Sequence, residues 1–300
     1  MKKYLAIDIG KTSLKYAVIN EELDFSDKGK EYISSVDSKD ELFDTIRDVA
    51  DQFRGEVEGV TITMPGVIDT KKGFAYSGGM YPWARNIPYA QMLSDHIGMK
   101  VAIANDAKAC AFAEMGYGSL KKVQNGVLYM ILATGIGGAV ISNGQLLNGE
   151  HFGAGEFSYM RGDYMNREST EDMFALACSI DGLSRIVEAV SGLSNLNVFR
   201  IFSKVQMGDE LVRQGVETYC DMLATYIYNV QCVLDSQRIV MGGNITDEPV
   251  FMKMIKEAVH RKFEDARFKF IREPEIRGCV FSGTARMIGA MYNYKQIFEE

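Results

Sequence analysis

The sequence predicts an α/β protein that is made of two similar halves. Apolar segments of strand length alternate with helical segments, which is typical of a largely parallel sheet. A strand, a glycine-containing turn and a second strand open the chain around Asp8, and the same order recurs around Thr134. The 300 residues are enough for two domains of ordinary size.

Local patterns predict the elements of the first half in order. Strands are expected over 4–7 and 14–19 and a third over 32–35. Asp37 or Ser38 caps a helix whose apolar positions recur on one face from Leu42 to Phe53. The half continues with a strand (60–63), a loop (73–88), a short helix (89–96), a strand (101–104) and an alanine-rich helix (107–115).

The second half begins with strands over 126–133 and 139–142, joined by the turn 134–138. An insertion over about 148–207 follows, and then a long helix over 210–234. A strand (238–241), a helix (249–263), a strand (278–281) and a last helix end the chain. We therefore expect an N-terminal domain over 1–117 and a C-terminal domain over 118–285. The last helix, 286–300, is expected to pack back on the N-terminal domain.

The composition excludes several classes of function. There are 33 Lys and Arg against 40 Asp and Glu, a net charge of −7, and no basic cluster that would bind nucleic acid. The five cysteines are scattered without a C-x-x-C pair, so neither a disulfide framework nor a clustered zinc site is indicated. No signal peptide and no apolar run of membrane-spanning length is recognised, so a cytoplasmic protein without membrane contact is expected.

Each of the two glycine turns has a functional and an ordinary interpretation. The first turn carries a carboxylate and a hydroxyl, and the second is richer in glycine. Such turns present backbone N–H groups to phosphate, and a carboxylate can hold magnesium. Glycine and aspartate are also common in plain hairpin turns. The candidate phosphate-binding residues are Asp8, Gly10, Lys11, Thr12, Thr134, Gly135, Gly137 and Gly138.

Asn105 and Asp106 follow an apolar strand and open a helix. Both residues are preferred helix caps, which is the ordinary interpretation. The functional interpretation makes Asp106 a general base that accepts a proton from an attacking hydroxyl group. The helix N-terminus is then expected to keep the pKa of Asp106 low.

Two further glycine segments are candidates. Gly242, Gly243 and Asn244 follow a strand, at the edge of a parallel sheet where ligands bind, although a plain strand–helix turn is equally consistent. Glu156 follows Gly155 and can accept hydrogen bonds from two sugar hydroxyls, or it is a solvated loop residue. Trp83 is expected to pack its loop against the domain.

In this order the motifs resemble those of the ROK family of sugar kinases and sugar-responsive repressors. The resemblance covers nearly the whole chain. It comprises 8–12, the Pro65-Gly66 turn, Asn105-Asp106, 134–138, Gly155-Glu156, Gly242-Gly243 and Gly283-Thr284-Ala285. It implies two actin-like (ribonuclease H-like) domains with an interdomain cleft.

The resemblance also implies the roles of the candidate residues. Asp106 corresponds to the catalytic base. Asn105, Glu156, Gly79 and Tyr159 lie on the sugar side. The two turns bind the phosphates of ATP, and Gly242, Gly243 and Asn244 bind adenosine. Asp8 is the candidate magnesium residue.

Three positions depart from the family pattern. Lys11 replaces a glycine, and Tyr159 replaces a histidine that binds zinc in many members. The cysteine-rich zinc motif is missing from 161–177, so no zinc is expected. Glu168, Glu171 and Asp172 are the candidates for the acid that closes that motif. This pattern resembles β-glucoside kinases and some Firmicutes N-acetylmannosamine kinases, and Ser77-Gly78-Gly79 favours the former.

The expected function is therefore an ATP- and magnesium-dependent sugar kinase that acts on a hexose or hexose derivative, at the C6 hydroxyl. A glucose or β-glucoside substrate is favoured, and N-acetylmannosamine and fructose remain open. The chain starts directly on the first phosphate strand, which favours an enzyme over a repressor. A non-catalytic sugar-binding regulator is the alternative, and a polymerising ATPase is disfavoured. The resemblance implies a homodimer.

Overall fold

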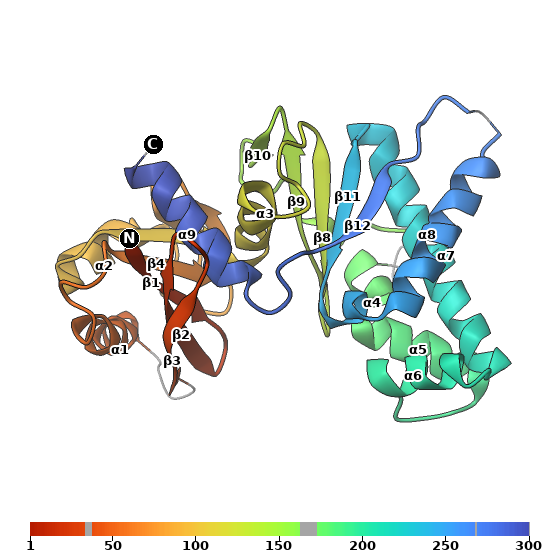
Figure 1. Cartoon of the computed structure of the whole chain (residues 1–300), viewed down its shortest axis with the longest axis horizontal. Coiled ribbons are helices and arrows are strands. Elements are labelled where there is room, and N and C mark those ends of the chain that lie inside the picture. Colours follow the sequence, from red (N-terminus) through yellow and green to blue (C-terminus); the bar gives the residue numbers. More distant parts are fainter. Residues whose placement is uncertain (34–37, 163–172, 268, 300) are drawn as a thin grey trace. The chain divides into compact units, whose positions relative to one another are not determined.

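The structure is a computed structural model that describes residues 1–33, 38–162, 173–267 and 269–299 (Figure 1). The chain forms two compact units, each of which is described by itself. Unit 1 contains Met1–Gly118, Gly149–Gly153 and Gly283–Glu300. Unit 2 contains Ser119–Asn148 and Ala154–Ser282.

Unit 1 is built on a five-stranded sheet in the order β3-β2-β1-β4-β7. The strands are β1 (Lys3–Ile9), β2 (Ser13–Asn20), β3 (Phe25–Tyr32), β4 (Val60–Met64) and β7 (Val101–Asn105). The first three pair antiparallel, while β4 and β7 run parallel to β1. Every residue of β4 and β7 is buried, as expected for parallel strands that are covered on both faces, although β7 lies at the edge of the sheet.

The helices of unit 1 are α1 (Lys39–Asp51), α2 (Tyr89–Ile97), α3 (Asp106–Gly116) and α9 (Ala285–Phe298). The prediction that Ser38 caps the first helix is confirmed, because its hydroxyl accepts a hydrogen bond from the Glu41 N–H at 3.3 Å. Helix α9 ends the chain but packs against α3, β4 and β7 (Figure 1). Gly289 permits this close approach, since a Cβ there would overlap the Ala109 carbonyl oxygen.

Unit 2 repeats the same sheet, in the order β10-β9-β8-β11-β12. The strands are β8 (Gly126–Ile131), β9 (Ile136–Ser142), β10 (Gln145–Leu147), β11 (Arg238–Gly242) and β12 (Glu275–Gly278). Again the first three pair antiparallel and the last two run parallel to the first. The predicted α/β fold of two similar halves is confirmed.

The helices of unit 2 pack around one apolar core. They are α4 (Phe174–Cys178), α5 (Ile180–Ser191), α6 (Val198–Gln206), α7 (Glu210–Leu234) and α8 (Pro249–Glu264), with 3₁₀ turns η1 (Phe157–Tyr159) and η2 (Asn244–Asp247). The helices α4, α5 and α6 all lie within the predicted insertion. The candidate acids Glu168, Glu171 and Asp172 lie outside the described residues.

Several strand predictions are wrong in position. The third strand is Phe25–Tyr32 rather than 32–35, and the last is Glu275–Gly278 rather than 278–281. Both are edge strands, in which few residues are buried, so apolar alternation does not mark them. Strand β9 begins at Ile136, so that Gly137 and Gly138 belong to the strand and not to the turn. The predicted loop 73–88 contains β6 (Phe74–Ser77), which forms a hairpin with β5 (Val67–Asp69).

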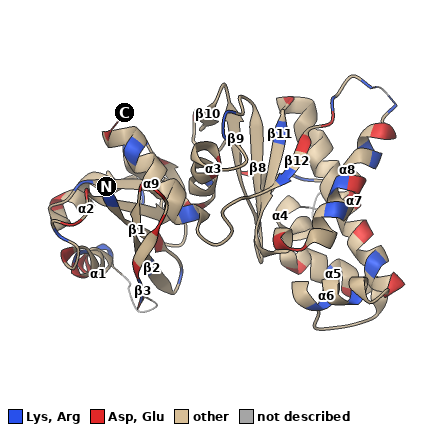
Figure 2. Ribbon diagram, viewed as in Figure 1, with Lys and Arg blue, Asp and Glu red and all other residues tan. Residues whose placement is uncertain are grey.

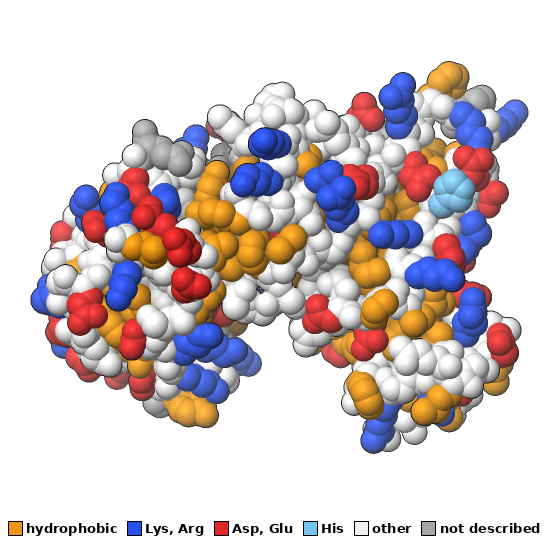
Figure 3. Space-filling view, in the orientation of Figure 1, with side chains coloured by type: hydrophobic (Ala, Val, Ile, Leu, Met, Phe, Trp, Pro, Cys, Tyr) orange, Lys and Arg blue, Asp and Glu red, His pale blue; other side chains and the backbone are white. Residues whose placement is uncertain are grey.

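Charges of both signs are spread over the helices (Figure 2) and are interspersed on the face seen in Figure 3. Among the described residues, no helix has the length and apolar character needed to cross a membrane.

Candidate active site

Asp8 lies near the end of β1, beside the end of β4. The parallel register pairs Asp8 with Thr63, and the Thr63 hydroxyl donates a hydrogen bond of 2.8 Å to Asp8 Oδ1. The Asp8 side chain is only 15% exposed. One carboxylate oxygen is thus held in place by the sheet itself.

The first glycine turn is closed by a hydrogen bond from the Gly10 N–H to the Ser13 carbonyl at 3.0 Å. Lys11 is not among the non-glycine residues with positive φ, so lysine causes no backbone strain at this position. The Tyr81 hydroxyl, from the loop after β6, donates to the Gly10 carbonyl at 2.7 Å. Trp83 stacks on Tyr89 in the core of unit 1, as predicted.

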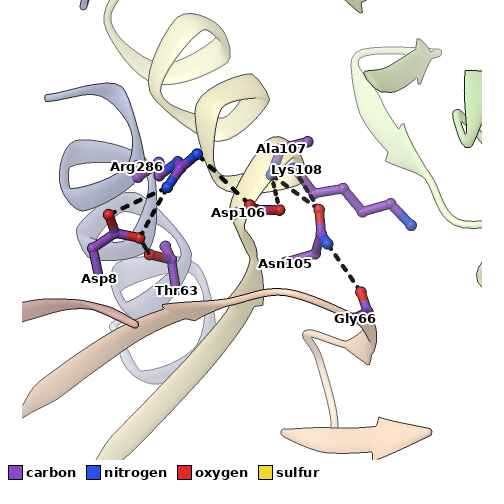
Figure 4. Close-up of polar contacts among 8 residues, drawn as sticks. All are labelled: Asp8, Thr63, Gly66, Asn105, Asp106, Ala107, Lys108 and Arg286. Atoms are coloured by element: carbon purple, nitrogen blue, oxygen red, sulfur yellow. Dashed lines mark hydrogen bonds and ion pairs between the residues drawn. The ribbon is translucent and has the colours of Figure 1, made fainter. Parts of the chain in front are cut away.

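Asn105 caps α3 and also holds the Pro65-Gly66 turn. Its Oδ1 accepts hydrogen bonds from the N–H groups of Ala107 and Lys108 at 3.0 and 3.1 Å. Its Nδ2 donates to the Gly66 carbonyl at 2.9 Å (Figure 4). The capping interpretation is therefore correct. No second bond from Nδ2 is made to the part of the chain that the structure describes, which leaves one amide hydrogen for a ligand.

Asn105→Ala is expected to destabilise the protein by about 1–3 kcal/mol, because it removes the cap and leaves buried polar groups without partners. Chemical unfolding monitored by circular dichroism measures this cost. Ser38→Ala is the matched control, since Ser38 caps α1 at an exposed position with one hydrogen bond. An equal cost for the two variants would show that the link to Gly66 contributes nothing.

Asp106 is the first residue of α3, and its Oδ1 accepts a hydrogen bond from the Ala107 N–H at 2.9 Å. Burial raises the pKa of this carboxyl, while Arg286 and the Ala107 amide oppose the rise. The prediction of a low pKa is therefore wrong, because the loss of hydration outweighs the helix N-terminus.

This raised pKa sets the sign of a stability effect. An aspartate that binds its proton more tightly in the folded chain costs stability once it is ionised. The cost is absent well below the ordinary value of 3.8, grows as the pH rises toward the raised pKa, and is constant above it. The unfolding free energy of Asp106→Asn, relative to wild type, is expected to increase with pH over this window. Urea unfolding at a series of pH values checks it, and a relative decrease with pH would contradict it.

Arg286 is the site residue that the sequence analysis missed. It is the second residue of α9, and it reaches both carboxylates (Figure 4). Its Nη1 lies 3.3 Å from Asp8 Oδ2, and its Nη2 lies 3.7 Å from Asp106 Oδ2. The sequence contained one signal for this residue: Arg286 stands in the first turn of the predicted last helix, where a cation is unfavourable.

Asp8 is the candidate residue for the magnesium ion that the family resemblance implies. Magnesium usually keeps several waters and takes one or two carboxylates together with phosphate oxygens. In the described part of the chain no group of three or more His, Cys, Asp or Glu side chains is placed to hold a metal. A single anchored carboxylate fits a hydrated magnesium ion that is shared with a polyphosphate.

The remaining sugar-side candidates lie in different units. Gly79 has a φ of +62° and lies in unit 1 against Pro65 and Gly66. Glu156 and Tyr159 lie at η1 in unit 2, and Tyr159 is 70% exposed. The structure thus brings Gly79 into the neighbourhood of the turn that Asn105 holds.

The second glycine turn lies between β8 and β9, and Ser158 forms hydrogen bonds with Ile136, the first residue of β9. The Ser158 hydroxyl donates to the Ile136 carbonyl at 2.7 Å and accepts from the Ile136 N–H at 3.2 Å. Among the described residues, a Cβ at Gly135 would make one ordinary contact, with Ser158 Oγ at 3.6 Å, so packing does not require glycine there. A Cβ at Gly138 would overlap the Phe157 ring, so Gly138 has a packing reason that needs no ligand. Thr134 lies in the same turn.

A cavity of about 390 Å³ lies in unit 2 where Gly243 and Asn244 follow β11. Its walls are mainly apolar and come from the end of β8 and the starts of α5 and α6. They comprise Ile131, Leu132, Ala133, Ile180, Asn197, Val198, Phe199, Gly243 and Asn244. Gly242 lies beside it, where a Cβ would approach Met130 Sδ at 2.5 Å. A cavity of this size and polarity suits a purine nucleoside.

Comparison with known proteins identifies the class. The profile of the ROK family matches residues 4–297. The chain is 27% identical to a β-glucoside kinase of Klebsiella pneumoniae, covering 99% of this chain and 97% of the relative. It is 27% identical to an N-acetyl-D-glucosamine kinase of Shigella sonnei, covering 96% and 98%.

The solved structures agree with this class. A ROK family protein of Streptococcus pneumoniae TIGR4, in complex with sucrose, superposes with a TM-score of 0.84 at 25% identity, covering 98% of both chains. The chain belongs to the ROK family, and its two units are actin-like domains. The resemblance predicted from the motifs is confirmed.

Proposed function

We propose that this chain is a sugar kinase that transfers the γ-phosphoryl group of ATP to the C6 hydroxyl of a hexose or hexose derivative. The observation that carries the proposal is the position of Asp106, a half-buried carboxylate at the N-terminus of α3 that follows Asn105 and shares Arg286 with Asp8. The named relatives are kinases of sugars, which supports the reaction class. Because these relatives are named kinases, they also support ATP as the phosphoryl donor.

Asp106 would act as the general base. Its carboxylate accepts the proton of the attacking hydroxyl as the new bond from oxygen to phosphorus forms. The bond between the γ-phosphorus and its bridging oxygen breaks, and ADP leaves. A raised pKa makes the carboxylate a better base than an ordinary aspartate. Orientation of the hydroxyl contributes as much as deprotonation in phosphoryl transfer.

The sugar would be held mainly by hydrogen bonds. Asn105 offers its remaining amide hydrogen, and the Glu156 carboxylate can accept from two neighbouring hydroxyls. Gly79 and Tyr159 are the further candidates on this side. Gly79 packs against Pro65 and Gly66, the turn whose carbonyl accepts the hydrogen bond from Asn105.

The nucleotide would be bound through the cavity of unit 2. Adenosine fits against Gly243 and Asn244, with Gly242 beside it. The phosphates would be held by backbone N–H groups of both turns and by the hydroxyls of Thr12 and Thr134. Neither Lys11 nor Thr12 uses its backbone N–H group within the described chain, so both groups are available. Magnesium at Asp8, when bound, would neutralise phosphate charge.

The favoured substrate is glucose or a β-glucoside, with N-acetylmannosamine and fructose as the alternatives. An ADP-coupled assay over hexoses, N-acetylhexosamines and β-glucosides, with ATP and magnesium, tests both the activity and the substrate. Sugar-dependent release of ADP is expected for one class of substrate. Failure of every sugar to stimulate ADP release would exclude the kinase.

A second candidate is a sugar-binding protein that does not transfer phosphate. The observation that favours it is the guanidinium of Arg286, which lies within 3.5 Å of both oxygens of the proposed magnesium carboxylate. Sugar binding by calorimetry without any ADP release would support this candidate.

A further inference from the structure

Arg286 carries a positive charge at a position where such a charge destabilises the helix. It is the second residue of α9, and the N-terminus of a helix repels a cation. The capping residue Thr284 makes no side-chain cap hydrogen bond. The Arg286 side chain is half-buried, with 36% of it exposed.

The contacts of Arg286 are loose. Its Nη1 lies 3.3 and 3.5 Å from the two oxygens of Asp8, and Nη2 lies 3.7 Å from Asp106. A settled arginine–carboxylate pair makes two parallel hydrogen bonds of about 2.7–2.9 Å. Here one guanidinium contacts two carboxylates and makes a close bidentate pair with neither of them. Its fork of donors remains able to bind another anion.

Two carboxylates, those of Asp8 and Asp106, share the single positive charge of Arg286. Asp8 and Asp106 both lie in the neighbourhood where the proposed reaction brings a polyphosphate to a sugar hydroxyl. Arg286 offsets one of the two carboxylate charges, and magnesium bound at Asp8 would compete for the same oxygens. The guanidinium would then need a new acceptor nearby, and the oxygens of the transferred phosphoryl group provide it.

We propose that Arg286 is a catalytic residue whose guanidinium binds the γ-phosphoryl group of the nucleotide and stabilises it during transfer. This inference rests on the proposed function. The guanidinium donates hydrogen bonds to the equatorial phosphoryl oxygens, where charge is spread in the transition state. Arg286 keeps its charge throughout, and Asp106 takes the hydroxyl proton.

The test compares the binding of ADP with that of a non-hydrolysable ATP analogue, using isothermal titration calorimetry with magnesium. Arg286→Met is expected to lower the affinity for the ATP analogue by about 10-fold or more, since a hydrogen bond to a charged group contributes about 1.5–3 kcal/mol. ADP affinity is expected to stay within about two-fold. Turnover in the ADP-coupled assay is expected to fall by about 10³-fold.

Two further variants keep the test decisive. Arg286→Lys retains the charge without the fork and is expected to recover part of the preference for the analogue. Lys295→Met is the control on the same helix, because Lys295 pairs with Glu21 at 2.9 Å, away from the site. It is expected to leave the ratio of the two affinities unchanged.

The outcomes separate the inference from the proposed function. If the wild-type protein binds neither nucleotide, the kinase proposal fails. If it binds both, and Arg286→Met and Arg286→Lys both retain the wild-type affinity ratio, the inference about Arg286 is wrong. Faster turnover in Arg286→Met would also overturn it, because the guanidinium would then be an inhibitor of the site. Should Arg286→Met fail to fold, the lysine variant alone decides.

Discussion

Asp106→Asn is expected to lower the turnover of the enzyme by about 10²–10⁴-fold, the range that a general base contributes. The asparagine keeps the size of the side chain and an oxygen that can accept the Ala107 N–H, so α3 should remain intact. It cannot accept the proton of the sugar hydroxyl. Steady-state kinetics with the substrate found in the sugar screen measures the loss.

Sugar binding separates this explanation from a loss of structure. Calorimetry is expected to give Asp106→Asn an affinity for the sugar within a few-fold of wild type, because Asn105 and Glu156 are unchanged. Asp40→Asn is the matched control, since Asp40 lies in the first turn of α1 and is exposed. Turnover near the wild-type value in Asp106→Asn would remove Asp106 from the mechanism.

The fold was predictable because its signals are local. The buried runs of β4 and β7 and the caps at Ser38 and Asn105 are each contained in a few consecutive residues. The edge strand β3 was misplaced because its exposed, charged residues carry no apolar period. The duplication was visible only because both halves begin with the same strand–turn–strand pattern.

The candidate site was predictable only in part, because some of its contacts join distant segments. Arg286 lies 278 residues from Asp8 in the chain, and only the packing of α9 beside β1 and β4 brings the two together. The bond from the Tyr81 hydroxyl to the Gly10 carbonyl likewise leaves no local pattern. The sequence also does not separate glycines that packing does not require, such as Gly135, from those that packing requires, such as Gly138.

The second large effect is expected at Gly243, which forms part of the wall of the cavity in unit 2. Its φ of +105° with ψ of 158° belongs to a region that only glycine occupies readily. A Cβ would also overlap the Ile131 carbonyl oxygen and approach the Ile131 carbonyl carbon at 3.0 Å. Gly243→Ala therefore has to displace the end of β8 or the strand–helix turn, and either movement deforms the cavity.

In Gly243→Ala the strain of a positive φ adds to the overlap with Ile131, and a control variant separates these two losses of stability. Gly208→Ala controls for a positive φ without overlap, since Gly208 has a φ of +87° and nothing within 4 Å of its Cβ position. The control is expected to lose about 1–2 kcal/mol of unfolding free energy and to keep its nucleotide affinity. Gly243→Ala is expected to lose a further 1–3 kcal/mol or so from the overlap. It is also expected to bind ADP at least about 10-fold more weakly, while sugar affinity is kept. If Gly243→Ala binds ADP as well as Gly208→Ala does, the cavity is not the adenosine site.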